Sequence, residues 1–483
     1  MPIKPLFLNT NKYAIVMVLI SSLLYGLFAY DLQRTEYTKL MLLYTALFFL
    51  FYKLVHVWKH QPTYLMAVAF IFRAIFILAI PNLSQDFYRF IWDGRLIMQG
   101  FNPYLHTVES FISNNEFPIA QAEELYLGMG TLNASHFSNY PPLNQFCFVI
   151  AAVFSGKSIL GAVATMRLLI IAADFGTLYF GSKLLKKLNL SVYTIFWFIL
   201  NPFIIIELTG NLHFESVMIF FLIWSLYLLH SGKWQLAACI LALSISVKLI
   251  PLMFMPLFFQ WFLKQGNNLN KPVRNKKTIA SCFPKEIKTH YNRQGMKTFI
   301  AFSLLVLLIS GLLFLPFFSS QFIKNYTKTV GLWFYSFEFN ASLYYVFREI
   351  GYMFSGYNQI ALIGKVTPMV VIVFVLIITF YKKNITSTQL ISSMIMVLSF
   401  YYFTASTVHP WYIAMLLILS VFTTYKFPLV WSFVIILSYL SYMDVGKADK
   451  SENLWIIALE YGVVFGVLLY ELIAKKNANG SLV

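Results

Sequence analysis

The sequence of 483 residues predicts an all-α polytopic membrane protein with about 14 transmembrane helices and long helical outer loops. Hydrophobic residues make up 59% of the chain and charged residues only 11%, a balance that soluble globular domains do not reach. The apolar residues are gathered into runs, many of them near the roughly 20 residues that cross a bilayer as a helix. Because backbone polar groups in a bilayer must bond within their own segment, we expect these runs to be helical.

The shorter runs are expected to pack inside the bundle. Residues 141–156, PPLNQFCFVIAAVFSG, are apolar over too short a stretch, and we expect a non-spanning helix that begins at Pro141 and Pro142. In chain order the expected spans are Tyr13–Ala29, Met41–Trp58, Tyr64–Ile80, Ile159–Leu184, Val192–Ile206, Leu212–Leu229, Trp234–Val247, Ile250–Phe262, Thr298–Phe314, Val366–Phe380, Gln389–Phe403, Trp411–Thr424, Phe427–Tyr442 and Leu454–Ile473.

Basic residues decide the orientation, because Lys and Arg beside membrane helices stay on the cytoplasmic side. With the N-terminus inside, 22 of the 36 basic residues lie inside and 15 of the 19 acidic residues lie outside. We therefore expect both termini to be cytoplasmic. For the membrane itself, we expect a bacterial inner membrane in preference to the endoplasmic reticulum. The basic loop from Lys264 to Lys297 then faces anionic lipid headgroups, and no nucleic-acid partner is needed to explain the net charge of +17.

Three polar and aromatic segments fall on the outer face. They are residues 81–158, the short NPFIIIELTGNLHFE at 201–215, and residues 315–365. Loops this long are usually either functional or disordered, and these are too aromatic for disorder, so we expect them to line a functional site. We divide the chain into two N-terminal helices (1–62), a module that carries the outer segments (63–425) and C-terminal helices (426–483).

The first outer segment begins with SQDFYRFIWDGR, in which Asp86, Arg89, Asp93 and Arg95 follow a span directly. One interpretation is a pair of i,i+3 or i,i+4 ion pairs on an interfacial helix. The other is a polar site at the membrane boundary, which fits Asp86 better than Asp93 or Arg95 because Asp86 comes first.

The second outer segment places Glu207, His213 and Glu215 at the outer ends of two neighbouring helices. A single residue of this kind is often only an interhelical hydrogen-bond partner, but three that face the same compartment as Asp86 favour a site. His-x-Glu does not fit zinc, since i,i+2 residues do not share a helix face. A metal bound here would be an oxygen-coordinated divalent ion such as Mg²⁺ or Mn²⁺.

The motifs SQDFYRFIWDGR with GFNPYL, NYPPL, NPFIIIELTGNLHFE, SVKLIPLMFMPL and VHPWY follow one another in this order. Together they resemble the GT-C superfamily of membrane glycosyltransferases across residues 64–425, and within it the mannosyltransferases that use polyprenyl-phosphate mannose. In that family an acidic residue of the first large outer loop is the essential carboxylate, which corresponds to Asp86. Many members have two neighbouring acids there, whereas this chain has Gln85 and Asp86, which weakens the case for a metal at this position.

The resemblance implies transfer of a hexose, mannose, from a polyprenyl-phosphate sugar donor to a glycan or glycolipid acceptor at the extracytoplasmic face. Such a displacement needs a carboxylate to take the acceptor proton and cations or hydrogen-bond donors to stabilise the departing phosphate. We expect Asp86 to be the base, assisted by Glu215 or Glu207. The other candidates are Arg89, Lys248, His213 and His409 for the donor phosphate, and Asp93, Arg95, Asn102, Tyr104, Tyr140, Trp333 and Glu338 for contacts to the sugar or acceptor.

Simpler roles stay open for several of these residues. Lys248 sits at an outer helix end, where an ammonium group also reaches water by snorkelling. Trp333, Tyr335 and Trp411 are either sugar-stacking residues or members of an interfacial aromatic belt. For the whole protein, the alternatives are a lipid or sugar transporter or flippase, which would carry more ionisable residues at mid-membrane, and a non-catalytic membrane scaffold, which would tolerate loss of Asp86.

Overall fold

The computed structural model of the protein describes residues 12–265, 293–442 and 452–480. Within these ranges the chain is helical and contains no β-strand; the one bridge of β type there joins Phe339 to Thr407. The predicted all-α class is therefore confirmed.

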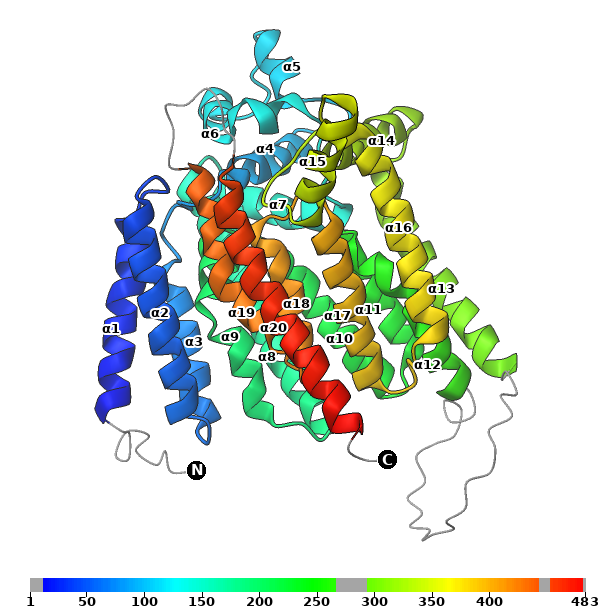
Figure 1. Ribbon diagram of the computed structural model, residues 1–483. Helices are drawn as coiled ribbons and strands as arrows, with labels where there is room; N and C mark the ends of the chain where they lie inside the picture. The colour runs from blue at the N-terminus through cyan, green and yellow to red at the C-terminus, as the bar shows by residue number, and fades with distance from the viewer. Residues whose placement is uncertain (1–11, 266–292, 443–451, 481–483) are drawn as a thin grey trace.

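The helices follow one another with short connections (Figure 1). The first part of the chain forms α1 (Lys12–Tyr30), α2 (Tyr37–Val57), α3 (Pro62–Ile75), α4 (Asp86–Met98), α5 (Val108–Ser113), α6 (Ala122–Ser135), α7 (Pro142–Ser155) and α8 (Ile159–Lys187). The middle forms η1 (Val192–Ile195), α9 (Phe196–Ile199), the π-helix η2 (Ile204–Gly210), α10 (Glu215–His230), α11 (Trp234–Val247), η3 (Ile250–Leu257) and α12 (Phe258–Gln265). The last part forms α13 (Arg293–Phe314), η4 (Leu315–Phe317), α14 (Ser320–Tyr335), α15 (Leu343–Ser355), α16 (Ile360–Tyr381), α17 (Ser387–Thr404), η5 (Pro410–Tyr412), α18 (Ile413–Ser420), α19 (Phe427–Val434), η6 (Ile435–Tyr442) and α20 (Leu454–Gly480).

Six of the described helices are long and apolar enough to cross a membrane: α1, α2, α8, α13, α16 and α20. A seventh span results if residues 192–199 and η2, which meet at a bend of 60°, are taken together. The other predicted spans fall on helices that are shorter, bent or less apolar, so the structure supports an integral membrane protein but does not confirm about 14 spans. The short helix expected over residues 141–156 is present as α7, which has 14 residues and Pro142 in its first turn.

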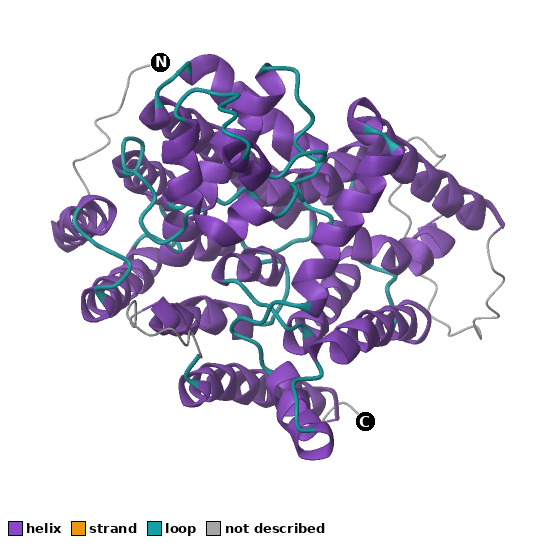
Figure 2. Cartoon of the chain, turned by 90° about the horizontal axis from the view of Figure 1, so that it is seen from above, coloured by secondary structure: helices purple, strands orange, loops and turns teal. Residues whose placement is uncertain are grey.

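The helices that do not run along the bundle gather at one end of the molecule. In Figure 1, α4, α5, α6, α14 and α15 lie at the top, whereas α1 begins and α20 ends at the bottom. There α4 packs against α6 and α7. Seen from above, the connecting loops meet over the middle of the bundle (Figure 2). The polar segments of the sequence therefore share one end of a helix bundle.

Two buried arginines, Arg73 and Arg167, connect neighbouring helices inside the bundle. Arg73 of α3 forms an ion pair with Asp174 of α8 at 2.7 Å, and neither side chain is exposed. Arg167 of α8 donates instead to backbone carbonyls, at 2.8 Å to both Thr209 and Gly210. A carbonyl left without its helical partner in a π-helix is expensive inside apolar surroundings, and the guanidinium group satisfies two of them. Both arginines thus stabilise the walls of the bundle.

Candidate active site

Asp86 is the first residue of α4 and lies at the edge of the central loops. Its backbone N–H donates to Ser84 Oγ at 3.3 Å, and its Oδ1 accepts from Asn133 Nδ2 at 3.3 Å. The side chain is partly buried. It forms no ion pair among the described residues, so the carboxylate keeps acceptor capacity for a ligand.

Arg89, which follows Asp86 by one helical turn, is bonded to other residues. Arg89 Nε donates to Asp93 Oδ1 at 2.8 Å, and Nη1 donates to the carbonyls of Asn133 at 2.6 Å and His136 at 3.0 Å. With a side chain only 3% exposed, Arg89 is closed to a donor phosphate in this conformation. Of the i,i+3 and i,i+4 ion pairs that the sequence allows, Arg89 forms the one with Asp93 and not the one with Asp86, since two carbonyls of a later loop also bind its guanidinium group.

Asp93 completes the same buried network. Its Oδ2 accepts from Ser138 Oγ at 2.6 Å and from Gln145 Nε2 at 3.0 Å, and the side chain has no exposed surface. The interpretation of Arg89 and Asp93 as an ion pair on one helix therefore describes them correctly. Asp93 contacts a sugar only if this network opens.

Lys248 and Glu215 join the ends of two helices close to Asp86. Lys248 follows α11 in an extended conformation, and its Nζ forms an ion pair with Oε1 of Glu215, the first residue of α10. The ammonium group also lies 5.7 Å from the centre of the Tyr412 ring. Glu215 Oε2 is buried without a hydrogen-bond partner among the described residues. This oxygen is free to accept from a ligand.

The pKa of Asp86 depends first on burial and then on residues that lie far from it along the chain. Burial raises the pKa of Asp86, and the Glu215 carboxylate raises it further. The positive charges of Lys248 and Arg34 and the hydrogen bond from Asn133 act in the opposite direction. A carboxylate whose pKa is raised is a stronger base than an exposed one.

Three aromatic rings form a stack beside Lys248. The ring centroid of His213 lies 3.7 Å from that of Trp411 at an interplanar angle of 18°, and His409 lies 4.6 Å from Trp411 at 6°. Burial and the charge of Lys248 lower the pKa of His409 to about 3. His213 Nε2 and His409 Nδ1 are buried without partners among the described residues. The two imidazoles therefore offer neutral polar nitrogens to a ligand.

Glu207 is buried, as Glu215 is. It belongs to the π-helix η2, is 1% exposed, and accepts from Tyr439 Oη at 2.8 Å through Oε1. Its Oε2 has no partner within the described residues. π-Helical turns are frequent at functional sites, and this one carries a buried carboxylate.

Tyr140 lies near Asp86, and Tyr104 is bonded to the backbone of Tyr140. Burial and, after it, the charge of Asp86 raise the pKa of Tyr140, which places its ring near the predicted base. Tyr104 Oη donates to the Tyr140 carbonyl at 2.5 Å. Tyr104 is itself fully buried, so it acts on the site through the backbone of Tyr140 rather than by touching a ligand.

Arg95 and Asn102 bind other parts of the outer loops. Arg95 donates to the carbonyl of Ala120 at 2.8 Å, and Asn102 donates to that of Phe317 at 3.1 Å. Neither side chain has a hydrogen bond to the residues around Asp86 in the described chain. Both join segments far apart in sequence, which is a structural role that their motif does not reveal.

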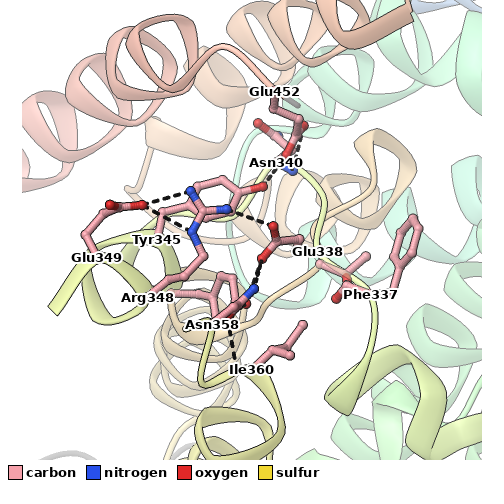
Figure 3. A network of polar contacts seen from close by, with 11 residues as sticks. Phe337, Glu338, Asn340, Tyr345, Arg348, Glu349, Asn358, Ile360 and Glu452 are labelled. Atoms are coloured by element: carbon pink, nitrogen blue, oxygen red, sulfur yellow. Dashed lines mark hydrogen bonds and ion pairs between the residues drawn. The ribbon is translucent and has the colours of Figure 1, made fainter. Parts of the chain in front are cut away.

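Trp333 and Glu338 lie on and after α14, in the second long outer segment. The ring of Trp333 packs against His136 at 5.6 Å and lies 6.3 Å from His409. Glu338 is held in a separate network, in which it accepts from Arg348 Nη1 at 2.7 Å (Figure 3). It also accepts from Tyr344 Oη at 2.7 Å. The structure thus brings Trp333, but not Glu338, toward the aromatic stack.

The structure also adds residues that the sequence patterns did not single out. Arg34, in the connection between α1 and α2, donates to the Leu83 carbonyl just before Asp86. Tyr412 follows Trp411 in the VHPWY motif and lies under Lys248. The motif was a signal for Tyr412, whereas no local pattern marks Arg34. Among the described residues, no three His, Cys, Asp or Glu side chains are grouped as metal ligands.

A comparison with protein families finds one match, which covers residues 17–264, just over half of the chain. The matching family is described as alpha-(1->6)-mannopyranosyltransferase, N-terminal domain. No curated protein matches the chain. The matched range contains Asp86, Glu207, His213, Glu215 and Lys248.

Proposed function

The chain belongs to the alpha-(1->6)-mannopyranosyltransferase family, whose members are glycosyltransferases of the GT-C type, and we propose that it transfers mannose from a polyprenyl-phosphate donor at the extracytoplasmic face. The acceptor is a glycan or glycolipid hydroxyl, and the family description makes an α-(1→6) linkage the first to test. The observation that carries the proposal is the position of Asp86, a carboxylate that forms no ion pair within the described residues and whose pKa is lowered by the charge of Lys248.

In this proposal Asp86 is the general base. Its carboxylate accepts the proton of the acceptor hydroxyl while that oxygen bonds to the anomeric carbon of mannose. The bond from this carbon to the phosphate oxygen breaks, and its electron pair leaves with the phosphate. Glu215 and Glu207 are helper carboxylates, since each has one oxygen without a partner in the described chain. A positioned base contributes about 10²–10⁴-fold to the rate.

The departing phosphate is assigned to Lys248, with His213 and His409 beside it. Lys248 supplies the positive charge, while the neutral imidazoles supply hydrogen bonds from either ring nitrogen, depending on the tautomer. Trp411 lies between the two imidazoles and fixes both rings. Arg89 is removed from this role, because its guanidinium group is already bonded inside α4 and the following loop. A divalent ion is not required by this arrangement.

The proposed donor and the proposed side of the membrane both depend on where a lipid-linked sugar can react. A lipid-phosphate sugar has its phosphate at headgroup level and its chain in the bilayer. Asp86, as the first residue of α4, lies at the end of the bundle where the outer segments gather, with apolar helices below it (Figure 1). Together with the charge distribution of the sequence, this supports an extracytoplasmic site, cytoplasmic termini and a catalytic module over residues 63–425.

The test is mannosyl transfer by the purified full chain in lipid vesicles. Radiolabelled polyprenyl-phosphate mannose, polyprenyl-phosphate glucose and a nucleotide-linked mannose are offered with an alkyl α-mannoside acceptor, with and without EDTA. We expect product only with the polyprenyl-phosphate mannose and only with wild-type Asp86. Activity with the nucleotide sugar would overturn the donor assignment. Movement of labelled lipid across the vesicle without a glycosidic product would instead favour a flippase.

A further inference from the structure

A segment of the second long outer loop, residues 336–342, lies beside the VHPWY motif. The N–H of Phe339 donates to the carbonyl of Ser406 at 3.0 Å, and the N–H of Val408 donates to the carbonyl of Phe339 at 2.9 Å. These two hydrogen bonds fix the backbone of the segment against the residues that directly precede His409.

The side chain of Phe339 contacts the aromatic stack of the site. Its ring centroid lies 5.1 Å from that of His409, at an interplanar angle of 29°. Trp411 stacks on the same imidazole at 4.6 Å. An imidazole can rotate about two side-chain bonds unless its neighbours prevent it, and stacking by two rings limits this rotation. The direction of His409 Nδ1, which has no partner among the described residues, therefore depends on Phe339 as well as on Trp411.

The next residue, Asn340, is bound by the C-terminal part of the chain. Its backbone N–H donates to Glu452 Oε2 at 2.8 Å, as Figure 3 shows, and its carbonyl accepts from Tyr461 Oη at 2.8 Å. Its side-chain Nδ2 donates to Glu460 Oε1 at 3.2 Å. Asn340 and Glu460 have no exposed surface. Both the backbone and the side chain of Asn340 are thus fixed by buried polar contacts.

The backbone of Asn340 turns the chain at this point. Its φ is +45°, in the left-handed region that Asn adopts more readily than most residues other than Gly. The turn separates Phe339, which contacts His409, from α15, which begins at Leu343. A change at Asn340 therefore alters the position of the Phe339 ring.

The residues that bind Asn340 lie beyond the proposed catalytic module, residues 63–425. Glu452 lies two residues before α20, and Glu460 and Tyr461 lie on α20. The family match, which ends at residue 264, does not include them either. The last helix of the chain is in this way connected to the aromatic stack.

We propose that Asn340 is a positioning residue for His409. In this role α20 and the residue before it bind Asn340, and Asn340 fixes Phe339, whose ring orients the imidazole assigned to the donor phosphate. The inference rests on the proposed function for the role of His409. It gives α20 a part in donor binding.

The experiment uses the purified full chain in lipid vesicles with Asn340→Ala, Phe339→Ala and the double variant. Affinity on the donor side is the dissociation constant of polyprenyl phosphate, the leaving product, and affinity on the acceptor side is that of an alkyl α-mannoside. Hydrogen–deuterium exchange of residues 337–342 and 406–409 reports the contact between the two segments without any turnover.

We expect Asn340→Ala to speed exchange in both segments and to weaken binding of polyprenyl phosphate by about tenfold, because a displaced group loses its contact geometry. Binding of the mannoside should not change. Phe339→Ala should cause the same loss, and the double variant should lose no more, since Asn340 acts through that ring. Asn340→Gly, which suits a positive φ and keeps the backbone hydrogen bonds, should retain part of the affinity. If Asn340→Ala does not fold, the same comparison is made with Asn340→Gly.

Asn384→Ala is the matched control. Asn384 follows α16, is as buried as Asn340, and is bonded to Ile378 and Ser393. Its loss should lower the melting temperature and leave the affinity for polyprenyl phosphate unchanged. An equal loss of affinity in Asn384→Ala would show that lower stability alone explains the effect, and would overturn the proposal.

The remaining outcomes separate this proposal from the proposed function. Wild-type affinity for polyprenyl phosphate in Asn340→Ala overturns the positioning role, and so do additive losses in the double variant. A wild type that binds polyprenyl phosphate but transfers no mannose contradicts the proposed function alone, and the affinities of the variants still decide about Asn340. A wild type that does not bind polyprenyl phosphate overturns both.

Discussion

The side chain of Asn211 is bonded to the backbone of Leu83, with 3.0 Å between Asn211 Oδ1 and Leu83 N. Asn211 Nδ2 also donates to the carbonyl of Ile206 at 3.2 Å, and the side chain is 1% exposed. One amide therefore connects the turn that leads into Asp86 to the π-helix that carries Glu207. The relative position of the two carboxylates depends on this contact.

We expect Asn211→Ala to lower kcat by about tenfold or more, because a displaced base loses rate steeply with distance. The free energy of unfolding should fall by about 1–3 kcal/mol, the usual result of unpaired buried polar groups. Asn201→Ala is the matched control, since Asn201 is equally buried and bonded but contacts Phe203 and Ser432. An equal loss of kcat in both variants, at equal stability, would show that Asn211 matters only for folding.

Asp86→Asn should separate activity from stability. Turnover should fall by about 10²-fold or more, since the base is lost while shape is kept. Burial raises the pKa of Asp86, so ionisation of this carboxyl costs stability as the pH rises through its folded-state pKa. We therefore expect the variant to melt at the same or a higher temperature than wild type at pH 7, with the difference closing at pH 4 or below. A lower melting temperature at pH 7 would mean that the ionised carboxylate stabilises the fold.

The same raised pKa predicts where kcat/KM falls on the acid side of its pH profile. In wild type, kcat/KM should fall as the pH drops through the pKa of Asp86, at a pH above that of an exposed Asp. His409 should contribute no limb near neutrality, because its pKa is lowered to about 3. A profile measured from pH 4 to pH 9 checks both points. A limb near pH 6.5 that disappears in His409→Gln would contradict the second.

The sequence predicted which segments meet but not which side chains within them meet. Hydrophobic length and charge placement are local properties, so the helical class and the gathering of the outer segments followed from them. The sequence could not choose between the i−3 and i+4 carboxylates as the partner of Arg89, because the carbonyls of Asn133 and His136, which also bind this side chain, lie more than 40 positions away. Arg34 was missed because its partners, Leu83 and Tyr442, are far along the chain.

Trp333→Ala and Glu338→Ala should differ, although the sequence predicts the same role for both. Trp333 packs between His136 and the stack, so its loss should raise the KM of a substrate about tenfold or less with a folded protein. Glu338 bonds to Arg348 and Tyr344 instead, and its loss should mainly lower stability. Steady-state kinetics and melting temperature decide between them. Unchanged KM in Trp333→Ala would show that the indole is packing only.

Membrane topology can be tested without any substrate. A reporter fused after Ala280, which lies outside the described residues, should be cytoplasmic, because nine basic residues surround it between Lys264 and Lys297. A reporter inserted near Asn114, after α5, should lie outside. Fusions with alkaline phosphatase and with a fluorescent protein give opposite signals and check one another. Reversed signals would place Asp86 on the cytoplasmic side and remove the extracytoplasmic proposal.

Lys248→Met should affect both donor binding and folding, because it leaves the buried Glu215 carboxylate without its cation. Breaking a buried pair on one side is strongly destabilising, here by about 3 kcal/mol. The double variant Lys248→Met with Glu215→Gln removes both charges and should recover most of that stability. It should not recover activity, since the cation assigned to the leaving phosphate is still absent. Melting temperature and kcat/KM are measured on wild type, both single variants and the double variant. Recovery of transfer in the double variant would mean that Lys248 serves only to neutralise Glu215.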